Sequence, residues 1–369
     1  MKIAVIHPTL NSAGGSEQVC IDILASLRDA GHKVVLGTFE NTNWDIVEKY
    51  FGKVSKPQFE IIDPRRFGIN AYGEFLNFRY LSSKMPQDSE AFVVSCNSPW
   101  FYPPKAKVLI MYLLPYIGYR QGLWRFYLEP YRSLQCKLLD RCRNKLLLTN
   151  SNFSAGLVND AYSVNARVLF PPVNIKRFFA SNKEDLVVTI GRFDPKKRHE
   201  LLIEAFRGIK PNVRCSIIGG VTRDFAVQSR AYLARLRKMI IEYGLSDRIE
   251  LKVNCKFDEL VKTLSKAKIY VHCCDNEQFG ISIVESMAAG CVPVVHRSGG
   301  AYYDILDHDE YGFSFGTVDE LREKINLIIE KSWLFTAYKR KAIQRAGIFS
   351  EQVFKARFID LVKSVTESN

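Results

Sequence analysis

The chain has 369 residues, of which 47% are hydrophobic and 25% charged, and its formal net charge is +13. This composition is that of a folded globular protein and excludes an intrinsically disordered one, while the length favours two domains. No run reaches about 18 consecutive apolar residues, so no membrane-spanning helix is predicted. The positive charge points to nucleic acid, anionic lipid or a phosphorylated substrate as partner.

The first residues and the cysteines indicate the cellular compartment of the protein. Residues 1–10 carry a single lysine and lead into a polar, glycine-rich loop, which predicts a first strand and not a signal peptide. The nine cysteines are odd in number and contain no CxxC pair. This usage favours a reducing environment over a disulfide framework, so we predict a cytoplasmic protein.

Strands and helices alternate along the first half of the chain. Short apolar runs bounded by polar residues predict strands, and a helix is expected after the first of them, from Ser16 to about Ala30. The predicted strands are Lys2–Ile6, Lys33–Gly37, Phe59–Ile62, Ala91–Ser95, Lys107–Tyr112 and Leu146–Thr149.

A second series of strands begins near Asp185, after a polar stretch with paired prolines at residues 170–185. Two tandem α/β domains with parallel sheets are therefore predicted. We expect an N-terminal domain over 1–175, a C-terminal domain over 176–345 and a last helical segment over 346–369. The strands of the second series are Leu186–Ile190, Val213–Ile218, Arg248–Val253, Lys268–His272 and Val292–Val295, and its clearest helices are Arg230–Tyr243 and Asp319–Lys331.

Ligands of open parallel sheets bind beyond the carboxyl ends of the strands, so the loops there are the candidate sites. The first such loop places Gly14 and Gly15 before a helix, where backbone N–H groups can meet a phosphate; a plain turn is the alternative. The loop lacks the GxGxxG spacing of a dinucleotide site. The second loop reads GRFDPKKRH and can aim Arg192 and Lys197 at an anion, or it is a solvated basic loop.

The third loop and the helix after it read NEQFGISIVESMAAG, with Glu285 inside an otherwise apolar or small-residue helix. A buried carboxylate needs a partner, which can be a basic side chain, a helix N-terminus or the hydroxyls of a ligand. A half-exposed or salt-bridged glutamate is the alternative. The fourth loop, after Val292–Val295, carries Gly299 and Gly300.

These loops together resemble the retaining GT-B glycosyltransferases, the large family that contains sucrose synthase and many mannosyltransferases. The motifs that carry the resemblance are GGSE, GRFDPKK, NEQFGISIVESMAAG and SGG. FPPVN at 170–174 resembles the subfamily of mannosyltransferases that extend the dolichol-linked N-glycan core on the cytosolic membrane face. The resemblance implies two Rossmann-like domains facing across a cleft, with a C-terminal helix crossing back to the N-terminal domain.

The resemblance also implies roles for the glutamate motif. In this family the second glutamate, here Glu285, binds the ribose hydroxyls of the nucleotide. The first, Glu277, contacts hydroxyls of the donor sugar, and the backbone N–H groups of Phe279, Gly280 and Ile281 approach the sugar and the phosphate.

The basic and glycine-rich loops take the remaining roles implied by the resemblance. Arg192 and Lys197 hold the pyrophosphate, and Gly14 and Gly15 meet the same phosphate from the N-terminal domain. The reaction moves a hexose of mannose or glucose type from a UDP- or GDP-linked donor to a lipid-linked or other glycan acceptor. It needs no cofactor and no metal, because these cationic groups stabilise the leaving nucleoside diphosphate.

Two features depart from the family pattern or compete with it. The family often has a histidine at the end of a late strand of the N-terminal domain, where this chain has Leu113 or Leu114, so the sugar stays open. A DxD triplet, Asp307 to Asp309, is a metal-binding pattern in the other major glycosyltransferase fold. We interpret it as a surface loop, because it lies outside the strand-end loops.

Residues 118–145 mix basic and aromatic side chains with a local net charge of +5. Such a segment can lie on an anionic membrane surface, which would make the protein peripheral on the cytosolic face of a membrane; a solvated helix is the alternative. Two other functions compete with the transferase. An NAD-dependent oxidoreductase would need the missing GxGxxG, and a nucleic-acid-binding protein would explain the charge but not the strand-end loops.

Overall fold

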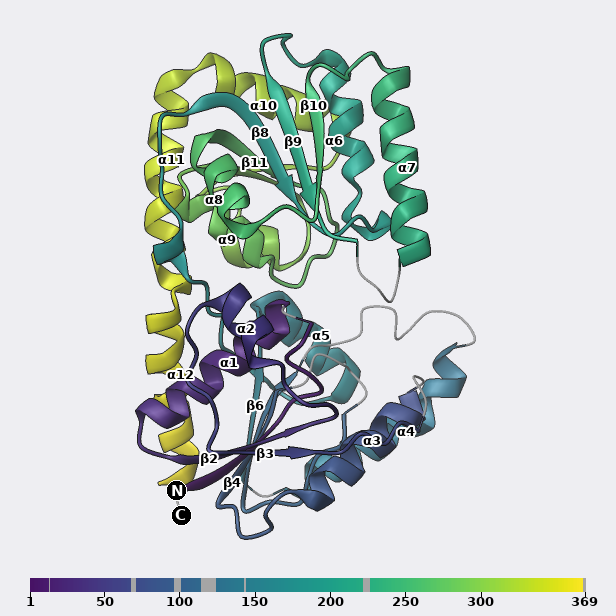
Figure 1. The fold of residues 1–369 in the computed structure, drawn as a ribbon, viewed down its shortest axis with the longest axis vertical. Coiled ribbons are helices and arrows are strands. Elements are labelled where there is room, and N and C mark those ends of the chain that lie inside the picture. The colour runs from purple at the N-terminus through teal and green to yellow at the C-terminus, as the bar shows by residue number, and fades with distance from the viewer. Residues whose placement is uncertain are drawn as a thin grey trace. The chain divides into compact units, whose positions relative to one another are not determined.

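The structure is a computed structural model that describes residues 1–12, 14–67, 71–95, 101–113, 124–142, 144–221 and 226–367. The chain divides into two compact units (Figure 1). The N-terminal domain comprises Met1–Pro172 and Glu351–Asn369, and the C-terminal domain comprises Val173–Ser350.

The N-terminal domain is a parallel sheet between two layers of helices. Side chains of β1 alternate between the layers: Ile3 and Val5 pack with α1 and α12, whereas Ala4 and Ile6 face the core beneath α3, α4 and α5. Its helices are α1 (Gly15–Asp29), α2 (Trp44–Phe51), α3 (Ala71–Lys84), α4 (Trp124–Asp140), α5 (Asn152–Tyr162) and α12 (Glu351–Thr366). Its strands are β1 (Lys2–Ile6), β2 (Lys33–Thr38), β3 (Phe59–Ile62), β4 (Ala91–Ser95), β5 (Val108–Leu113), β6 (Asn144–Thr149) and β7 (Arg167–Val168).

The strand order of this sheet is β3-β2-β1-β4-β5-β6-β7, and all pairs are parallel. The order reverses between β1 and β4, where the connections pass to opposite sides of the sheet. The last helix, α12, packs against α1 through buried Phe354 and Phe358, so the end of the chain completes this core (Figure 1).

The C-terminal domain repeats the architecture. Its strands are β8 (Glu184–Ile190), β9 (Arg214–Gly219), β10 (Ile249–Val253), β11 (Ala267–His272), β12 (Val292–His296) and β13 (Phe313–Phe315). Its helices are α6 (His199–Ala205), α7 (Ala226–Glu242), α8 (Phe257–Lys266), α9 (Ile281–Ala288), α10 (Val318–Glu330) and α11 (Ser332–Ala346). Shorter turns of helix are η1 (Ile175–Arg177), η2 (Pro195–Lys197), η3 (Phe206–Gly208), η4 (Ala301–Ile305) and η5 (Gly347–Phe349).

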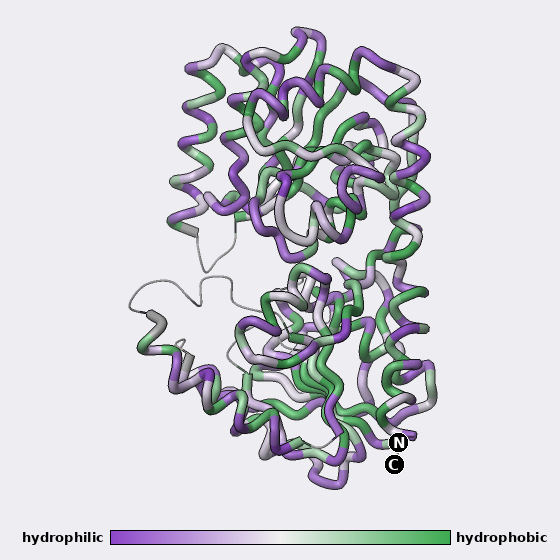
Figure 2. Tube along the Cα trace, turned by 180° about the vertical axis from the view of Figure 1, so that it is seen from behind, coloured by the Kyte–Doolittle hydropathy of each residue, from purple (hydrophilic) through white to green (hydrophobic). Residues whose placement is uncertain are grey.

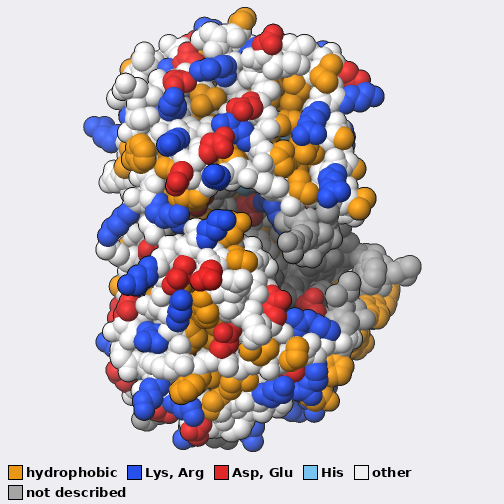
Figure 3. Space-filling model, viewed as in Figure 1, with side chains coloured by type: hydrophobic (Ala, Val, Ile, Leu, Met, Phe, Trp, Pro, Cys, Tyr) orange, Lys and Arg blue, Asp and Glu red, His pale blue; other side chains and the backbone are white. Residues whose placement is uncertain are grey.

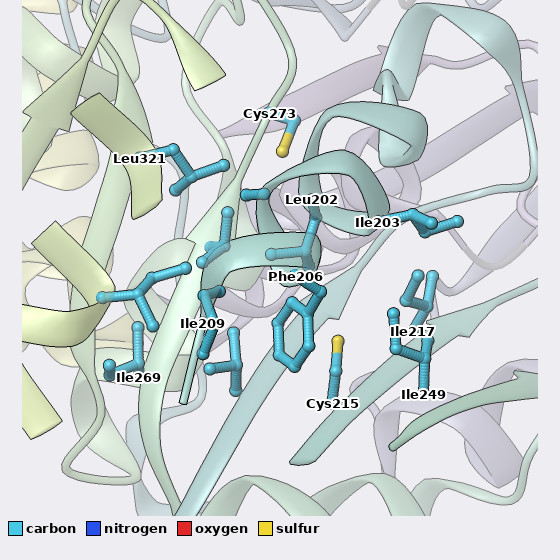
Figure 4. Packing of buried hydrophobic residues seen from close by; sticks show 14 of the residues in the cluster. Leu202, Ile203, Phe206, Ile209, Cys215, Ile217, Ile249, Ile269, Cys273 and Leu321 are labelled. Atoms are coloured by element: carbon cyan, nitrogen blue, oxygen red, sulfur yellow. The ribbon is translucent and has the colours of Figure 1, made fainter. Parts of the chain in front are cut away.

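This sheet is also parallel, in the order β10-β9-β8-β11-β12-β13, and it reverses between β8 and β11. One face packs on α6, α7 and α10, and Figure 4 shows Leu202 of α6 and Phe206 of η3 lying over Cys215 and Ile217 of β9. Hydropathy colouring shows the strands as the hydrophobic part of each domain (Figure 2). Each domain is thus built around its own buried sheet.

Every strand predicted from the sequence is present, with small differences at its ends. β7 and β13, which consist of two and three residues, are not among the predicted strands. Segments this short are too brief to show a recognisable alternation. The predicted α/β fold class, with two parallel sheets, is confirmed. No helix in the described part of the chain is long and apolar enough to cross a membrane.

One lysine ties the sheet of the C-terminal domain to two helix ends. The ammonium group of Lys183, just before β8, donates to the carbonyl oxygens of Leu264, Ala267 and Ala289 at 3.3, 2.8 and 2.6 Å. These carbonyls lie at the ends of α8 and α9, where helical hydrogen bonding leaves acceptors without partners. Lys183 therefore brings a charged donor to carbonyls at two helix ends, where those of Leu264 and Ala267 also accept from the thiol of Cys291 at 3.3 Å.

We expect Lys183→Met to destabilise the C-terminal domain by about 2–4 kcal/mol, because three acceptors lose a charged donor in a partly buried place. The measurement is urea unfolding followed by a probe specific to this domain. Lys262→Met, at an exposed position on α8, is the matched control. Equal stability of the two variants would contradict the role given to Lys183.

Candidate active site

The candidate site lies where the C-terminal sheet reverses its order. Because β8 and β11 are neighbours and parallel, the loops after them begin next to each other at one edge of the sheet. The loop after β8 supplies Arg192 and Lys197, and the loop after β11 supplies Glu277. Residues about 80 positions apart in sequence thereby meet.

Glu277 is at the centre of this meeting point. Its Oε2 lies 2.5 Å from Lys197 Nζ and 3.1 Å from His272 Nε2. The side chain of His272 is almost fully buried, whereas those of Glu277 and Lys197 are 20% and 23% exposed. The carboxylate is therefore held from two sides while part of it stays open to solvent or to a ligand.

The electrostatics of this trio favour an ionised carboxylate. Burial alone would raise the pKa of Glu277, but the hydrogen bond from His272 and the charge of Lys197 outweigh it and hold the pKa well below its usual range. Burial lowers the pKa of His272, although Glu277 opposes the shift. A neutral His272 donates from Nε2 to Glu277, so the site carries one carboxylate and one ammonium.

The hydroxyl group of Tyr270 connects His272 to two further polar groups. The hydroxyl of Tyr270 lies 3.4 Å from His272 Nδ1, 2.7 Å from the hydroxyl of Ser282, and 3.3 Å from the carbonyl oxygen of Ile190. These contacts fix the ring of His272, and through it the carboxylate of Glu277. Tyr270, His272 and Ser282 are not among the predicted site residues, since positions in a buried strand and an apolar helix look structural. Their polar character at a strand end was the available signal.

The glycine pair of the fourth loop shapes the loop that carries Glu277. Asn276 has a positive φ of 48°, and its N–H donates to Ser298 Oγ at 2.8 Å. The N–H of Gly300 donates to the carbonyl oxygen of Glu277 at 2.8 Å. Gly299 has a φ of 69°, and a Cβ there would lie 2.7 Å from the backbone nitrogen of Glu277. The SGG segment thus braces Glu277 and leaves no room for a side chain at Gly299.

The loop after β8 is braced in a similar way. The N–H of Phe193 donates to the carbonyl oxygen of Gly220 at 3.1 Å, and His199 Nε2 lies 3.3 Å from the carbonyl oxygen of Arg192. The side chain of Arg192 is exposed, and no ion pair involves it within the described part of the chain. Its guanidinium is therefore available to an anion near Lys197.

Phe279, Gly280 and Ile281 form the start of α9. The ring of Phe279 is buried against Phe349, with ring centroids 5.3 Å apart, which fixes the approach to the helix. Gly280 is the N-cap with a φ of 105°, and Ile281 is the first helical residue. The first turn of a helix leaves backbone N–H groups without helical partners, so this end of α9 can face a phosphate.

Glu285 lies one turn into α9 and is half-buried. Burial raises the pKa of Glu285 to about 7, and the positive charge of Arg177 only partly opposes this shift. Arg177 stacks its guanidinium over the ring of Phe257 at 3.6 Å. The carboxyl group of Glu285 is thus less easily ionised than that of Glu277, which lies one loop away.

Gly14 and Gly15 belong to the N-terminal domain. Gly14 is the N-cap of α1, and its N–H donates to Glu17 Oε2 at 2.8 Å. The other oxygen of Glu17 lies 3.6 Å from Nε2 of His7, both side chains being buried. Gly14 is therefore held by Glu17 at the start of α1.

The remaining candidate residues lie elsewhere. Asp307, His308 and Asp309 form an exposed or half-exposed turn with positive φ values, and Asp309 accepts from Ser314 at 3.0 Å. Leu113 is buried at the end of β5, and Leu114 lies outside the described residues. Residues 118–123 and 143 of the basic segment are also outside them, and residues 124–140 form α4.

Among known proteins, residues 173–347 match the family model described as glycosyl transferases group 1. The chain is similar to proteins named GDP-Man:Man(3)GlcNAc(2)-PP-Dol alpha-1,2-mannosyltransferase. Identity to the one from Xenopus laevis is 32% over 239 residues, covering 58% of this chain and 47% of that protein. Identity to the one from Caenorhabditis elegans is 27% over 431 residues, covering 94% and 88%. The chain spans about half the length of the Xenopus relative.

Solved structures agree on the fold. HepE from Anabaena, in complex with UDP and glucose, superposes with a TM-score of 0.76 at 19% identity, covering 99% of this chain and 100% of that chain. A sucrose-phosphate synthase from Thermosynechococcus elongatus gives 0.76 at 16% identity and covers both chains fully. At these identities the likeness concerns the fold alone, and it confirms the predicted GT-B class.

The raised pKa of Glu285 predicts a pH dependence of stability. Between its ordinary value of 4.5 and about 7, the folded domain holds a proton that the unfolded chain has lost. Stability therefore falls as pH rises through this window, by about 1–2 kcal/mol for a half-buried group. Glu285→Gln should lose this part of the pH dependence, measured by urea unfolding at several pH values from 4.5 to 8. The exposed control Glu323→Gln should follow the wild type; a wild-type slope in Glu285→Gln would refute the assignment.

Proposed function

We propose that this chain, whose residues 173–347 match the glycosyl transferases group 1 family, transfers a hexose from a nucleotide-sugar donor to a glycan acceptor. The observation that carries the proposal is the contact of Lys197 with Glu277 at the switch point of the C-terminal sheet. A cation for a phosphate and a carboxylate for sugar hydroxyls are adjacent there, as a nucleotide sugar requires.

The names of the relatives support a more specific donor and acceptor. They specify GDP-mannose as donor and a dolichol diphosphate-linked glycan as acceptor. We extend both to this chain and propose mannosyl transfer to a lipid-linked glycan. HepE, which shares only the fold, was solved with UDP, so a UDP-linked donor is the alternative.

The proposed chemistry is departure of a nucleoside diphosphate under electrostatic stabilisation. Arg192 and Lys197 hold the pyrophosphate, assisted by backbone N–H groups at the start of α9. These groups supply the positive charge that a divalent metal provides in other transferases, so we propose a reaction without a metal. In keeping with the family resemblance, the anomeric configuration of the sugar is retained.

The two glutamates have separate proposed tasks. Glu277, kept ionised by His272 and Lys197, accepts from hydroxyls of the donor sugar. Glu285 accepts from the ribose hydroxyls, which gives the half-buried carboxyl group its partner. The glycines Gly14 and Gly15 offer a further phosphate-facing helix start in the N-terminal domain.

Other functions fit the molecule less well. An NAD-dependent oxidoreductase would bind its cofactor at a GxGxxG loop, which is absent from the sequence. A nucleic-acid-binding protein would gather its basic residues into a stripe, whereas the face in Figure 3 scatters Lys and Arg among Asp and Glu.

We further propose that the N-terminal domain binds an anionic membrane surface. On α4 the side chains of Phe126, Tyr127 and Leu134 are 77%, 43% and 41% exposed. Tyr72 of α3 lies edge-to-face against Tyr127, with centroids 5.4 Å apart, and extends the aromatic surface. Exposed aromatic side chains beside basic ones are typical of proteins that lie at a lipid interface.

We expect the protein to sediment with vesicles that contain anionic lipid and to be released at high salt. Phe126→Ser combined with Leu134→Ser should reduce the bound fraction, because both side chains are exposed apolar groups. The control is Val227→Ser, at an apolar position of the C-terminal domain that is 82% exposed. Recovery in the supernatant at every lipid composition would show that α4 is a solvated helix.

The roles of the glutamates are separated by two substitutions. Glu285→Gln should weaken binding of free GDP by about 1–3 kcal/mol, because it removes a charge-assisted acceptor. Glu277→Gln should leave GDP affinity nearly intact but lower the rate of mannosyl transfer, since free GDP lacks the sugar. Calorimetry with GDP, and initial rates from GDP-mannose to a lipid-linked glycan, measure these effects.

The control is Asp275→Asn, which changes a carboxylate on the same loop that pairs with Arg198 at 3.4 Å. Equal losses of GDP affinity in both glutamate variants would show that the roles are wrongly divided. Absence of transfer from GDP-mannose and from UDP-sugars by the wild type, with stabilisation by NAD, would favour the oxidoreductase.

A further inference from the structure

We propose that His272, Cys274 and Glu277 form a binding site for a thiophilic divalent cation such as Zn²⁺, and that the ion inhibits the enzyme by occupying Glu277. The ligand atoms of these three side chains lie within 4.8 Å of one another, and they are the one such set among the described residues. The inhibitory part rests on the proposed function; the binding part does not.

The end of β11 brings the first two ligands to one side. β11 ends at His272, and the segment after it brings Cys274 Sγ within 4.8 Å of the ligand atoms of His272 and Glu277. Cys273 between them is buried in the core, as Figure 4 shows. The positive φ of Asn276 then turns the chain back, which returns Glu277 to His272 at 3.1 Å. The spacing His-x-Cys-x-x-Glu is thus folded into a cluster.

The donor set suits zinc. Imidazole nitrogen, thiolate sulfur and carboxylate oxygen all bind Zn²⁺, at about 2.0–2.3 Å, and three protein ligands leave the fourth position for water. Two ligand atoms already have a spacing close to that of a tetrahedral site. The thiol of Cys274 is half-exposed, lies within 4.8 Å of the other two ligand atoms, and can complete the set by rotation of its side chain.

Neighbouring groups support the first ligands. If Nε2 of His272 binds the metal, its proton resides on Nδ1, which faces the hydroxyl of Tyr270 at 3.4 Å. Such an outer hydrogen bond orients a metal-bound imidazole. The N–H of Gly300 holds the backbone of Glu277, so this residue is already ordered before the ion binds.

Lys197 is the natural competitor of the metal. Its ammonium group lies 2.5 Å from Glu277 Oε2, where it already neutralises the carboxylate. Binding of Zn²⁺ displaces this contact, and the thiol of Cys274 releases one proton to solvent as its sulfur binds the metal. No oxidation occurs. The affinity should therefore rise when Lys197 is removed and fall when Cys274 is removed.

The test uses the whole chain without any sugar substrate. Co²⁺ is titrated while the thiolate-to-cobalt charge-transfer absorption is recorded, and Zn²⁺ is then added as competitor. Cys274→Ser should abolish this absorption and weaken Zn²⁺ binding at least about tenfold, since the loss of even an outer-sphere partner costs that much. Lys197→Met should tighten Zn²⁺ binding several-fold. Cys255→Ser, at a half-exposed cysteine of the same domain, is the matched control and should bind as the wild type does.

Mannosyl transfer provides the second readout. Zn²⁺ should inhibit the wild type, and a chelator should restore its rate. For Cys274→Ser, the Zn²⁺ concentration that halves the metal-free rate of that variant should be at least about tenfold higher than for the wild type. Circular dichroism checks that each variant is folded. Unchanged Zn²⁺ affinity in folded Cys274→Ser, or a loss equal to that in Cys255→Ser, overturns the site. Metal binding without any transfer activity would instead count against the proposed function and against inhibition.

Discussion

The candidate site depends on one constraint, the parallel pairing of β8 with β11 at the centre of the C-terminal sheet. Because the order of strands reverses there, the following chain segments leave in opposite directions and open a gap at the sheet edge. Lys197 and Glu277 enter that gap from its two sides and meet at 2.5 Å. A shift of one residue in this register would move the side chains of one strand to the other face of the sheet and would displace the loop that follows it. Lys197 and Glu277 would then no longer meet.

The glycines of the site serve to bring backbones together. Gly299 and Gly300 lie directly against Glu277, and Gly219 lies against the carbonyl oxygen of Gly191 in the loop that leads to Arg192. A side chain at Gly299 or Gly219 would push the loops apart. The glycine-rich ends of β9 and β12 thus act as spacers that set the position of the charged side chains, although they need not touch a ligand themselves.

Burial then makes chemically similar groups differ. Glu277 and Glu285 are both glutamates near the start of α9, yet the pKa of Glu277 is low because of His272 and Lys197, whereas burial raises the pKa of Glu285. Such a separation of titration behaviour is characteristic of sites where each carboxyl group has its own task. It follows from which strand or helix carries each residue, and not from the residue type.

The sequence by itself determined the parallel α/β architecture, because buried strands such as Ala91–Ser95 and amphipathic helices have distinct local periods. It also identified Glu285, since a carboxylate inside an apolar helix needs a partner, and Lys197, which lies in a loop at a strand end. Glu277 became a candidate through the resemblance of its motif to a known family. Only the tertiary structure decided that Lys197 contacts Glu277. It also decided that Tyr270 contacts His272, and that Cys274 lies near His272 and Glu277. Those contacts depend on strand order and register, which arise from pairing between distant segments and leave no local pattern in the chain.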